Sequence, residues 1–272
     1  MSLPKITIII ANYNYGEYLK DCVDSGLRQD YDGEITVCVV NDGSSDNSWE
    51  VLKEILDNSE GEITTSQNEN MECRQTTFSK KRKLVCINQQ NGGASKARNT
   101  GIDACWEDTD AFCILDADDE YYPSKVSILV SKWLEDTIRI GVVYADYHII
   151  NTSNGRIVNE FKEPYDRHLL LKKCIVHSGA LISKDVFENV REESGEYYDS
   201  DLHGPASEGF IGSIEDYDLW IRVSEKFMIC HIPKCLSLVK ITGLNQSSNM
   251  SPEIFQKAWH IVQQKIKLRN AK

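Results

Sequence analysis

The sequence lacks any long apolar run. Its longest nearly unbroken stretch, residues 6–11, is far shorter than the ~20 residues of a membrane-spanning helix, and no basic, apolar and small-residue leader precedes it. Positive charge is also scarce, with 30 Lys and Arg against 42 Asp and Glu and a formal net charge of −12. This balance excludes a protein whose main task is to coat nucleic acid or an anionic membrane. We therefore expect a cytoplasmic chain with no nucleic-acid partner.

Paired cysteine motifs are absent as well. The nine cysteines include no Cys-x-x-Cys, and most lie in apolar runs, such as those around Cys38, Cys86 and Cys113. Free, buried thiols of a reducing compartment have this distribution, which argues against a disulfide framework or a zinc site. With 41% hydrophobic and 26% charged residues, the 272 residues can form a sizeable core.

The first half alternates short apolar runs with helical patterns. Strands are predicted at 5–11, 35–40, 84–87 and 111–115, and helices at 16–29, from about 45, at 93–105 and from Pro123. Apolar strands that alternate with helices indicate an α/β fold, a doubly wound, mostly parallel sheet with helices on both faces. Ligands of such sheets bind at the carboxyl ends of the strands.

The second half is mixed rather than regularly alternating. Predicted strands at 140–150 and 156–161 flank Asn154-Gly155, a dipeptide that favours a tight hairpin turn. Further predictions are a strand at 175–182, a helix at 215–227, a strand at 236–241 and a helix at 252–268. We expect this half to pack on the first as one continuous domain.

Two segments read as insertions. Residues 58–83 are polar and predict a mobile, solvated loop; alternatively, Lys80, Lys81, Arg82 and Lys83 contact an anionic membrane surface or partner. Residues 192–213 are long and rich in Gly, Ser and Tyr, and loops of this kind often form lids or substrate collars.

Polar residues follow the first two predicted strands. Tyr13, in Ala11-Asn12-Tyr13-Asn14, can stack on a planar base, although the segment also fits an ordinary strand-to-helix loop. Asp42, in Asn41-Asp42-Gly43-Ser44-Ser45-Asp46, can accept hydrogen bonds from a base or ribose. An Asp-Gly turn followed by a Ser or Asp cap is also ordinary chemistry for the start of a helix.

Carboxylates gather at two later positions. Asp116 and Asp118 follow a predicted strand and, being two residues apart on an extended chain, point the same way, toward one cation or toward a cation and a sugar hydroxyl. A solvated acidic turn fits the pattern equally. Glu215 and Asp216 stand at a helix start, where the helix dipole alone favours acidic residues.

Six motifs in this order resemble family 2 glycosyltransferases of GT-A fold. They extend over about residues 5–248 and comprise Ala-Asn-Tyr-Asn at 11–14, Val-Val-Asn-Asp-Gly-Ser-Ser-Asp at 39–46, Asn-Gly-Gly-Ala-Ser-Lys-Ala-Arg-Asn-Thr-Gly at 91–101, Leu-Asp-Ala-Asp-Asp at 115–119, His-Ser-Gly-Ala-Leu-Ile-Ser at 177–183 and Glu-Asp-Tyr-Asp-Leu-Trp at 215–220. The resemblance implies a single GT-A domain over 1–272, with a nucleotide-sugar-binding half at about 1–120, an acceptor-binding half at about 121–250 and a C-terminal helix at 251–272.

The resemblance further implies an inverting transfer of a sugar from a nucleotide diphosphate donor, a UDP-sugar first of all, to a hydroxyl of a glycan or lipid-linked sugar acceptor. Mg²⁺ or Mn²⁺ would be the cofactor. Asp118 would coordinate the metal, Asp216 would be the general base, and Glu215 would position Asp216 or the acceptor. The donor would contact Ala11, Tyr13, Asp42, Asn91, Arg98, Asp116 and Ala117. The product would be one linkage of a cell-surface polysaccharide or glycolipid.

The chain also departs from the family pattern. Lys240 and Thr242 stand where relatives often carry Arg and His, which leaves the third metal ligand open, and we interpret His177 and His231 as structural. Two alternatives remain. A sugar nucleotidyltransferase is disfavoured because no Gly-rich phosphate loop lies near the first strand. A catalytically silent sugar-nucleotide- or glycan-binding module is disfavoured by the intact Asp118 and Asp216.

Overall fold

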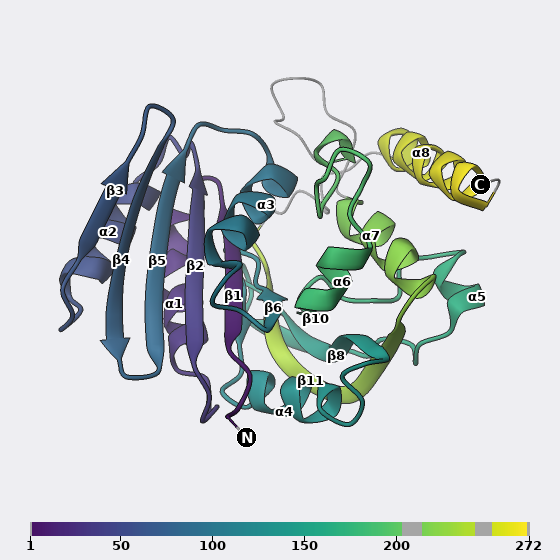
Figure 1. Cartoon of the computed structure of the whole chain (residues 1–272), viewed down its shortest axis with the longest axis horizontal. Helices are drawn as coiled ribbons and strands as arrows, with labels where there is room; N and C mark the ends of the chain where they lie inside the picture. The colour runs from purple at the N-terminus through teal and green to yellow at the C-terminus, as the bar shows by residue number, and fades with distance from the viewer. Residues whose placement is uncertain (1, 203–213, 243–251, 271–272) are drawn as a thin grey trace.

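One mixed β-sheet passes through both halves of the chain (Figure 1). The computed structural model describes residues 2–202, 214–242 and 252–270. Within these residues the 11-stranded sheet has the order β3-β4-β5-β2-β1-β6-β10-β8-β11-β7, with β9 paired to β8.

The centre of the sheet is parallel. Strands β1 (Ile6–Asn12), β2 (Ile35–Asp42), β5 (Arg82–Gln89) and β6 (Ala111–Ile114) pair side by side in one direction. Helices α1 (Gly16–Leu27) and α2 (Ser48–Asp57) share one core cluster with Ile8 and Ile10, and α3 (Ala94–Cys105) shares the other with Ile9. Successive strand residues face opposite sides of a sheet, so the helices cover both faces, which confirms the predicted α/β architecture.

The second half adds strands at the β6 end. Strands β8 (Ile140–Asn151) and β9 (Arg156–Glu160) form the predicted hairpin, but its turn has four residues, 152–155, because Asn151 pairs with Arg156. Gly155 supplies the left-handed turn residue at φ 68°. The remaining elements are β7 (Glu120–Tyr121), α4 (Lys125–Trp133), α5 (Arg167–Leu170), β10 (Leu181–Ser183), α6 (Lys184–Asn189), η1 (Ser200–Leu202), α7 (Glu215–Ser224) and β11 (Met228–Ile241).

The predicted strand at 175–182 is wrong for most of its length. Regular pairing begins only at Leu181, where β10 joins β6 and β8. Residues 175–180 leave the strand path, and the Ser178 hydroxyl donates to Asp116 at 3.2 Å. Apolar residues 175 and 176 are buried without being part of the sheet, which is why their pattern resembled a strand.

The predicted loop at 58–83 is also wrong. Strand β3 (Thr64–Gln67) pairs with β4 (Met71–Ser79), and β4 pairs antiparallel with β5. All four β3 residues are exposed, whereas Met71 and Cys73 of β4 pack against the core. Strands at the edge of a sheet bury little surface, so they carry few of the apolar residues from which strands are predicted.

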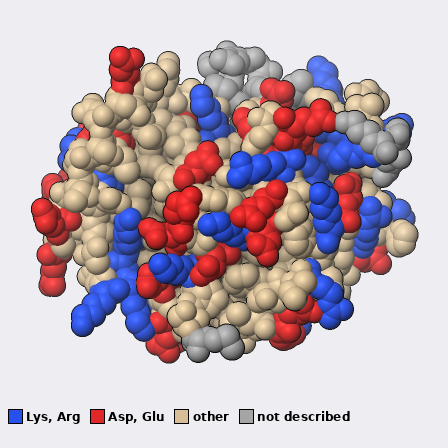
Figure 2. All heavy atoms as spheres, in the orientation of Figure 1, with Lys and Arg blue, Asp and Glu red and all other residues tan. Residues whose placement is uncertain are grey.

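The basic run 80–83 is partly structural. The Arg82 guanidinium donates to the backbone carbonyls of Gln29, Tyr31 and Gly33 at 2.7–2.9 Å, and Lys81 donates to the carbonyl of Asp32. Arg82 is therefore occupied in holding the loop before β2 and is not a free surface cation. On the face seen in Figure 2, acidic and basic side chains are interspersed, so the acidic excess forms no single large patch there.

The C-terminal helix α8 (Pro252–Asn270) rests on α7 (Figure 1). Trp259 stacks on Tyr217 with ring centroids 5.2 Å apart, and Val262 is buried in the core. All nine cysteines are free, as expected from their spacing. None of the described helices is long and apolar enough to cross a membrane.

Candidate functional site

Four parallel strands deliver polar residues to one edge of the sheet. Strands β1, β2, β5 and β6 run in the same direction, so their carboxyl ends and the loops that follow lie together. From these ends come Tyr13, Asp42, Gln89 and Asp116. Helix α7 brings Glu215 to the same place, through its contact with Arg98 of α3. Four residues predicted from the sequence, Tyr13, Asp42, Asp116 and Glu215, thus lie along this edge, together with Gln89.

The first loop of this site is held rigidly. Asn14, after β1, has a left-handed backbone at φ 62°, which Asn tolerates better than most residues. Its side-chain oxygen accepts hydrogen bonds from the backbone N–H groups of Ser45 (2.8 Å) and Asp46 (3.2 Å) in the loop after β2. Ala11 is half-buried beneath this loop, whereas the Tyr13 side chain is exposed and can stack on a ligand.

Asp42 holds the Asn-Gly-Gly segment, residues 91–93, in place through hydrogen bonds that we call the Asp42 clamp. It is 2% exposed, and its carboxylate accepts hydrogen bonds from the Gln89 side-chain amide (2.7 Å) and from the backbone N–H groups of Gly92 (3.0 Å) and Gly93 (2.8 Å). The Asn91 side chain donates to the Asp42 carbonyl at 2.8 Å. Burial raises the pKa of Asp42 although these hydrogen bonds lower it. Protein donors therefore already occupy the carboxylate that the sequence assigned to the nucleoside.

The acidic turn after β6 is closely packed. Asp118 and Asp119 are buried. Ala117, which lies between Asp116 and Asp118, is also buried. Burial, followed by the negative charge of Asp116, raises the pKa of Asp118 to about 7. Burial and the charges of Asp116 and Asp118 raise the pKa of Asp119 well above its ordinary value. The cluster is electrostatically unfavourable as it stands, and a proton or cation would relieve it.

Arg98 joins this turn to α7. Its guanidinium donates to Glu215 at one nitrogen and to Asp116 at the other, 3.2 Å away. Burial lowers the pKa of Arg98, but the charges of Glu215 and Asp116 outweigh burial and keep it above its ordinary value. The predicted role of Arg98 beside a diphosphate is not what these contacts show, because both outer nitrogens face carboxylates of the site itself.

Asp216 follows Glu215 in the first turn of α7. Burial, followed by the charge of Glu215, raises the pKa of Asp216 to about 7, and Arg98 acts in the opposite direction. Asp216 is less buried than Glu215, and its carboxylate accepts the backbone N–H of Tyr217 at 2.7 Å. A carboxyl group with a pKa close to 7 is suited to take and return a proton.

The residues of the site fit a divalent cation that is held mainly by a bound diphosphate and only in part by the protein. Within the described part of the chain no three His, Cys, Asp or Glu side chains gather as a complete metal site. Asp118 nevertheless offers a carboxylate that is destabilised by its neighbours. Mg²⁺ and Mn²⁺ use oxygen ligands, and Mg²⁺ commonly binds through one or two carboxylates plus substrate phosphates and water. Asp118 with a diphosphate meets that requirement without a third protein ligand.

The histidines and Lys240 have structural contacts. His231 lies 2.8 Å from Asp146 and stacks on Tyr144, away from the acidic turn. His177 accepts the backbone N–H of Gly179 at 3.1 Å, and burial lowers its pKa well below the ordinary value. Lys240 pairs with Glu120 at 2.7 Å, and its backbone N–H donates to Asp119 at 2.9 Å, so it supports the acidic turn from β11. Thr242 directly follows β11 and is the last residue described before the gap at 243–251.

Three residues of the site were not predicted as such. Gln89 contacts Asp42, Ser178 contacts Asp116, and Lys125 is buried with its ammonium 2.8 Å from the Ser237 hydroxyl. Burial lowers the pKa of Lys125 to about 7. Ser178 lies inside a recognised motif, and Gln89 precedes another by two residues, so adjacency to the motifs was the available signal. The proposed collar at 192–213 is described only to residue 202, and the rest of it lies outside the described residues.

Sequence comparison assigns most of the chain to one profile. Residues 7–191 match the profile Glycosyl transferase family 2. The hyaluronan synthase of Pasteurella multocida is 24% identical over 238 residues, which is 85% of this chain and 20% of that protein. The glycosyltransferase GlyA of Streptococcus pneumoniae serotype 4 is 34% identical over 151 residues, or 56% of this chain and 18% of that protein. The chain thus spans about a fifth of the length of these relatives.

Solved structures give the same fold. The S. aureus protein TarS (residues 1–349), in complex with UDP, superimposes with a TM-score of 0.62 at 17% identity, over 95% of this chain and 64% of that one. The mannosyltransferase PcManGT from Pyrobaculum calidifontis, in complex with GDP-Man and Mn²⁺, gives 0.59 at 16% identity, over 96% and 69%. Because the profile match covers residues 7–191, more than half of the chain, this chain belongs to glycosyl transferase family 2.

Proposed function

We propose that this chain transfers a sugar, with inversion, from a nucleoside diphosphate donor, UDP-sugars first, to a hydroxyl of a glycan or lipid-linked acceptor. The main support for the proposal is the contact of Arg98 with both Glu215 and Asp116. Through this contact the first turn of α7, which carries Asp216, lies beside the acidic turn after β6. The UDP complex of TarS and the GDP-Man and Mn²⁺ complex of PcManGT support the donor class and the need for a metal.

The donor would lie along the carboxyl edge of the parallel strands. Tyr13 would stack on the base, and the clamp formed by Asp42 and Asn91 would shape the base site. Ala11, Asp116 and Ala117 would line the ribose side. Arg98 would act by holding Asp116 and Glu215 in place. Asp118 would hold Mg²⁺ or Mn²⁺, whose positive charge would stabilise the diphosphate as it leaves.

Asp216 would be the general base. A sugar hydroxyl is a weak nucleophile near neutral pH, so a carboxylate within hydrogen-bond reach must take its proton as the new bond forms. The pKa of Asp216, raised to about 7 by burial and Glu215, matches that task near neutral pH. Glu215, paired with Arg98, would keep the backbone of Asp216 in place.

The wider setting follows from the proposed acceptors. A glycan or glycolipid of the cell surface is assembled from cytoplasmic nucleotide sugars, so the chain would act in the cytoplasm. Lys80 and Lys81 are exposed beside the β4–β5 turn and could meet the inner membrane surface. Residues 192–202, the described part of the proposed collar, would contribute to the acceptor side.

Titration of UDP into the protein tests the donor half of the proposal. We expect heat of binding in Mn²⁺ and at least a tenfold loss of affinity in EDTA, about 1.4 kcal/mol. Asp118→Asn should abolish the difference between Mn²⁺ and EDTA. Asp108→Asn, an exposed aspartate near the opposite end of the sheet, is the matched control and should behave as wild type. Equal affinity in Mn²⁺ and EDTA for the wild-type protein would contradict the metal assignment.

A further inference from the structure

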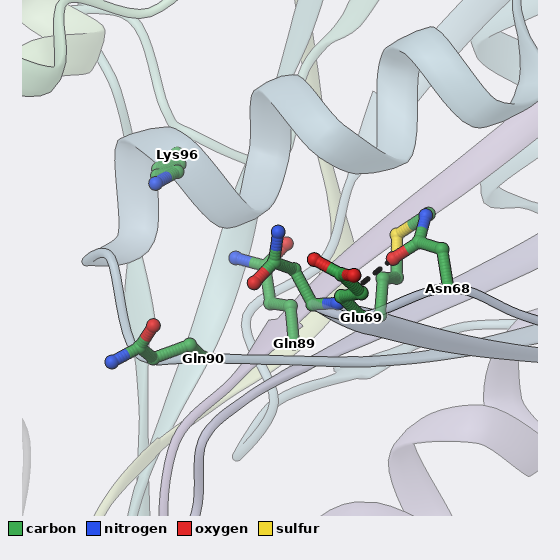
Figure 3. Close-up of a pocket in the computed structure, with 7 residues that line it drawn as sticks. Asn68, Glu69, Gln89, Gln90 and Lys96 are labelled. Atoms are coloured by element: carbon green, nitrogen blue, oxygen red, sulfur yellow. Dashed lines mark hydrogen bonds between the residues drawn. The ribbon is translucent and has the colours of Figure 1, made fainter.

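A pocket of about 680 Å³ lies beyond Asp42, one strand further out along the sheet. Its wall comes from three places: the β3–β4 turn, the end of β5 and the first turn of α3 (Figure 3). The lining residues are Asn68, Glu69, Asn70, Met71, Gln89, Gln90 and Lys96. The β3–β4 hairpin that closes it is the segment for which the sequence predicted a loop.

The position of the pocket relates it to the donor site. Along the carboxyl edge, β6 carries the acidic turn, β1 carries Tyr13, β2 carries Asp42 and β5 carries the pocket. Neighbouring strands are about 4.8 Å apart, so the pocket lies roughly 14 Å from the acidic turn. A nucleoside diphosphate with its phosphates at the acidic turn can extend along this edge, and its base then lies at the β2 and β5 ends.

Gln89 presents the polar atom that faces this pocket. The Asp42 carboxylate accepts three protein donors, so it has little capacity left for a ligand. One of those donors is the amide nitrogen of Gln89, 2.7 Å away, which fixes the orientation of the Gln89 amide. Its carbonyl oxygen then points away from Asp42, and no donor from the described residues bonds to it. Gln89 therefore carries an oriented acceptor at the wall of the pocket.

The remaining wall suits the edge of a heterocycle. Asn68, Asn70 and Gln90 carry amides, which both donate and accept, while Lys96 donates and Glu69 accepts (Figure 3). A bare phosphate would meet the Glu69 carboxylate, and an apolar ligand would leave these groups unpaired. A nucleobase has a flat apolar face and an edge of N–H and C=O groups, which amides of Asn and Gln can read.

We propose that Gln89 is a specificity-determining residue that reads the donor's nucleobase, with the base edge in this pocket, and that Asp42 acts by orienting Gln89. The proposal rests on the proposed function. Placed opposite the ring nitrogen, the Gln89 oxygen would accept the N3–H of uracil or the N1–H of guanine, whereas cytosine would set the bare acceptor N3 against it and offer only its neighbouring amino group. UDP or GDP is therefore bound in preference to CDP.

Calorimetric titration of the whole chain with UDP, GDP and CDP in Mn²⁺ tests this. We expect the wild-type protein to bind its preferred nucleotide at least tenfold more tightly than CDP. Gln89→Met keeps the length of the side chain but removes the acceptor, so it should reduce that ratio about tenfold. Gln67→Met, on exposed strand β3 and outside the pocket, should leave the ratio unchanged.

A second variant separates the pocket from the Asp42 clamp. Asn70→Trp fills the pocket from the β3–β4 turn and leaves the three donors to Asp42, at Gln89, Gly92 and Gly93, unsubstituted. It should weaken binding of the preferred nucleotide at least tenfold while pyrophosphate binding in Mn²⁺ stays unchanged. An unchanged nucleotide affinity in this variant, or an unchanged ratio in Gln89→Met, would overturn the inference while leaving the proposed function intact. A wild-type protein that binds no nucleotide would overturn both.

Discussion

Arg98 and Glu215, 117 positions apart in the sequence, form a buried ion pair that joins α3 to the first turn of α7. The side chain of Glu215 is 2% exposed and that of Arg98 is 8% exposed. The second outer nitrogen of Arg98 reaches Asp116, so one cation holds carboxylates from both sides of the site. This cation relieves part of the repulsion that the acidic residues would otherwise exert on each other.

Arg98→Met should destabilise the fold strongly. Removing one member of a buried ion pair leaves the other charge uncompensated, which typically costs about 3–5 kcal/mol. Urea unfolding measures the change in the free energy of unfolding. The control is Arg28→Met, which removes an exposed pair with Asp24 on α1 and should cost less than about 1 kcal/mol. The double variant Arg98→Met with Glu215→Gln should recover part of the loss. If Arg98→Met lowered the free energy of unfolding no more than Arg28→Met does, the pair of Arg98 with Glu215 would contribute nothing to stability.

Asp216→Asn should abolish transfer and spare donor binding. The amide cannot accept the proton of the acceptor hydroxyl, and loss of a general base typically lowers the rate ~10²- to 10⁴-fold. UDP release from a UDP-sugar in the presence of an acceptor measures the rate, and calorimetry with UDP measures binding. Asp185→Asn, at an exposed position on α6, is the control. Transfer at the wild-type rate would remove Asp216 from the mechanism.

The pH profile should report the same group. Because burial and Glu215 raise the pKa of Asp216 to about 7, the base is protonated at lower pH, and kcat/KM should rise with pH through a midpoint near 7. Glu215→Gln removes the neighbouring negative charge and frees Arg98, and both changes favour ionised Asp216. Its midpoint should therefore move to lower pH. A midpoint that stays near 7 in this variant would assign the titration to another group.

The sequence was sufficient for the parallel centre of the fold because buried strands leave a strong apolar signal. The runs at 5–11, 35–40, 84–87 and 111–115 became β1, β2, β5 and β6, and the polar residues after them met at one edge. The sequence also correctly placed Asp116 and Asp118 after a strand and Glu215 and Asp216 at the start of a helix. These residues follow recognisable elements, so local pattern fixes where they occur.

Contacts between distant residues could not be predicted in this way. Which carboxylates Arg98 meets depends on how α3 and α7 pack, and no local pattern encodes that. The sequence assigned Asp42 to a ligand but gave no sign of its hydrogen bonds with Gln89, Gly92 and Gly93. The hairpin β3–β4 escaped prediction because its outer strand is exposed throughout. Where burial is slight, the pattern carries little information.

Metal should stabilise the protein most at high pH. The pKa of Asp118 is raised from 3.8 to about 7, so the folded protein binds more protons than the unfolded chain between these values. In EDTA the contribution of Asp118 to stability is therefore complete below pH 3.8 and is lost as pH rises through about 7. Mn²⁺ needs the ionised carboxylate and replaces the proton.

Thermal unfolding at pH 5 and pH 8 checks this, with and without Mn²⁺. The increase in Tm caused by Mn²⁺ should be larger at pH 8. Asp118→Asn should lose that increase and, in EDTA at pH 8, should be more stable than the wild-type protein, because an amide removes a buried negative charge. Asp108→Asn should do neither. A wild-type Tm that responds equally to Mn²⁺ at both pH values would contradict the assignment of Asp118.

The C-terminal helix should depend on Lys265. Its ammonium pairs with Asp199, with Glu192 at 3.4 Å and with the fully buried Asp218 of α7 at 3.9 Å, so it connects three segments at once. Lys265→Met leaves these carboxylates short of one counter-charge, and we expect a loss of about 1–3 kcal/mol. Helix α8 also contacts the body through Trp259 on Tyr217, the buried Val262 and the ion pairs of Arg269 with Asp218 and Glu225. Because Lys265 connects α8 to residues of other segments, the loss should appear first as local opening of this helix. Hydrogen exchange of the α8 amides should accelerate about ten- to a hundredfold, in line with that free energy.

Lys267→Met, exposed on the same helix, is the matched control and should exchange as wild type. Uniform acceleration across the whole sheet would instead mean that Lys265 supports the global fold. Unchanged exchange would mean that α8 is held by its apolar contacts and by the ion pairs of Arg269.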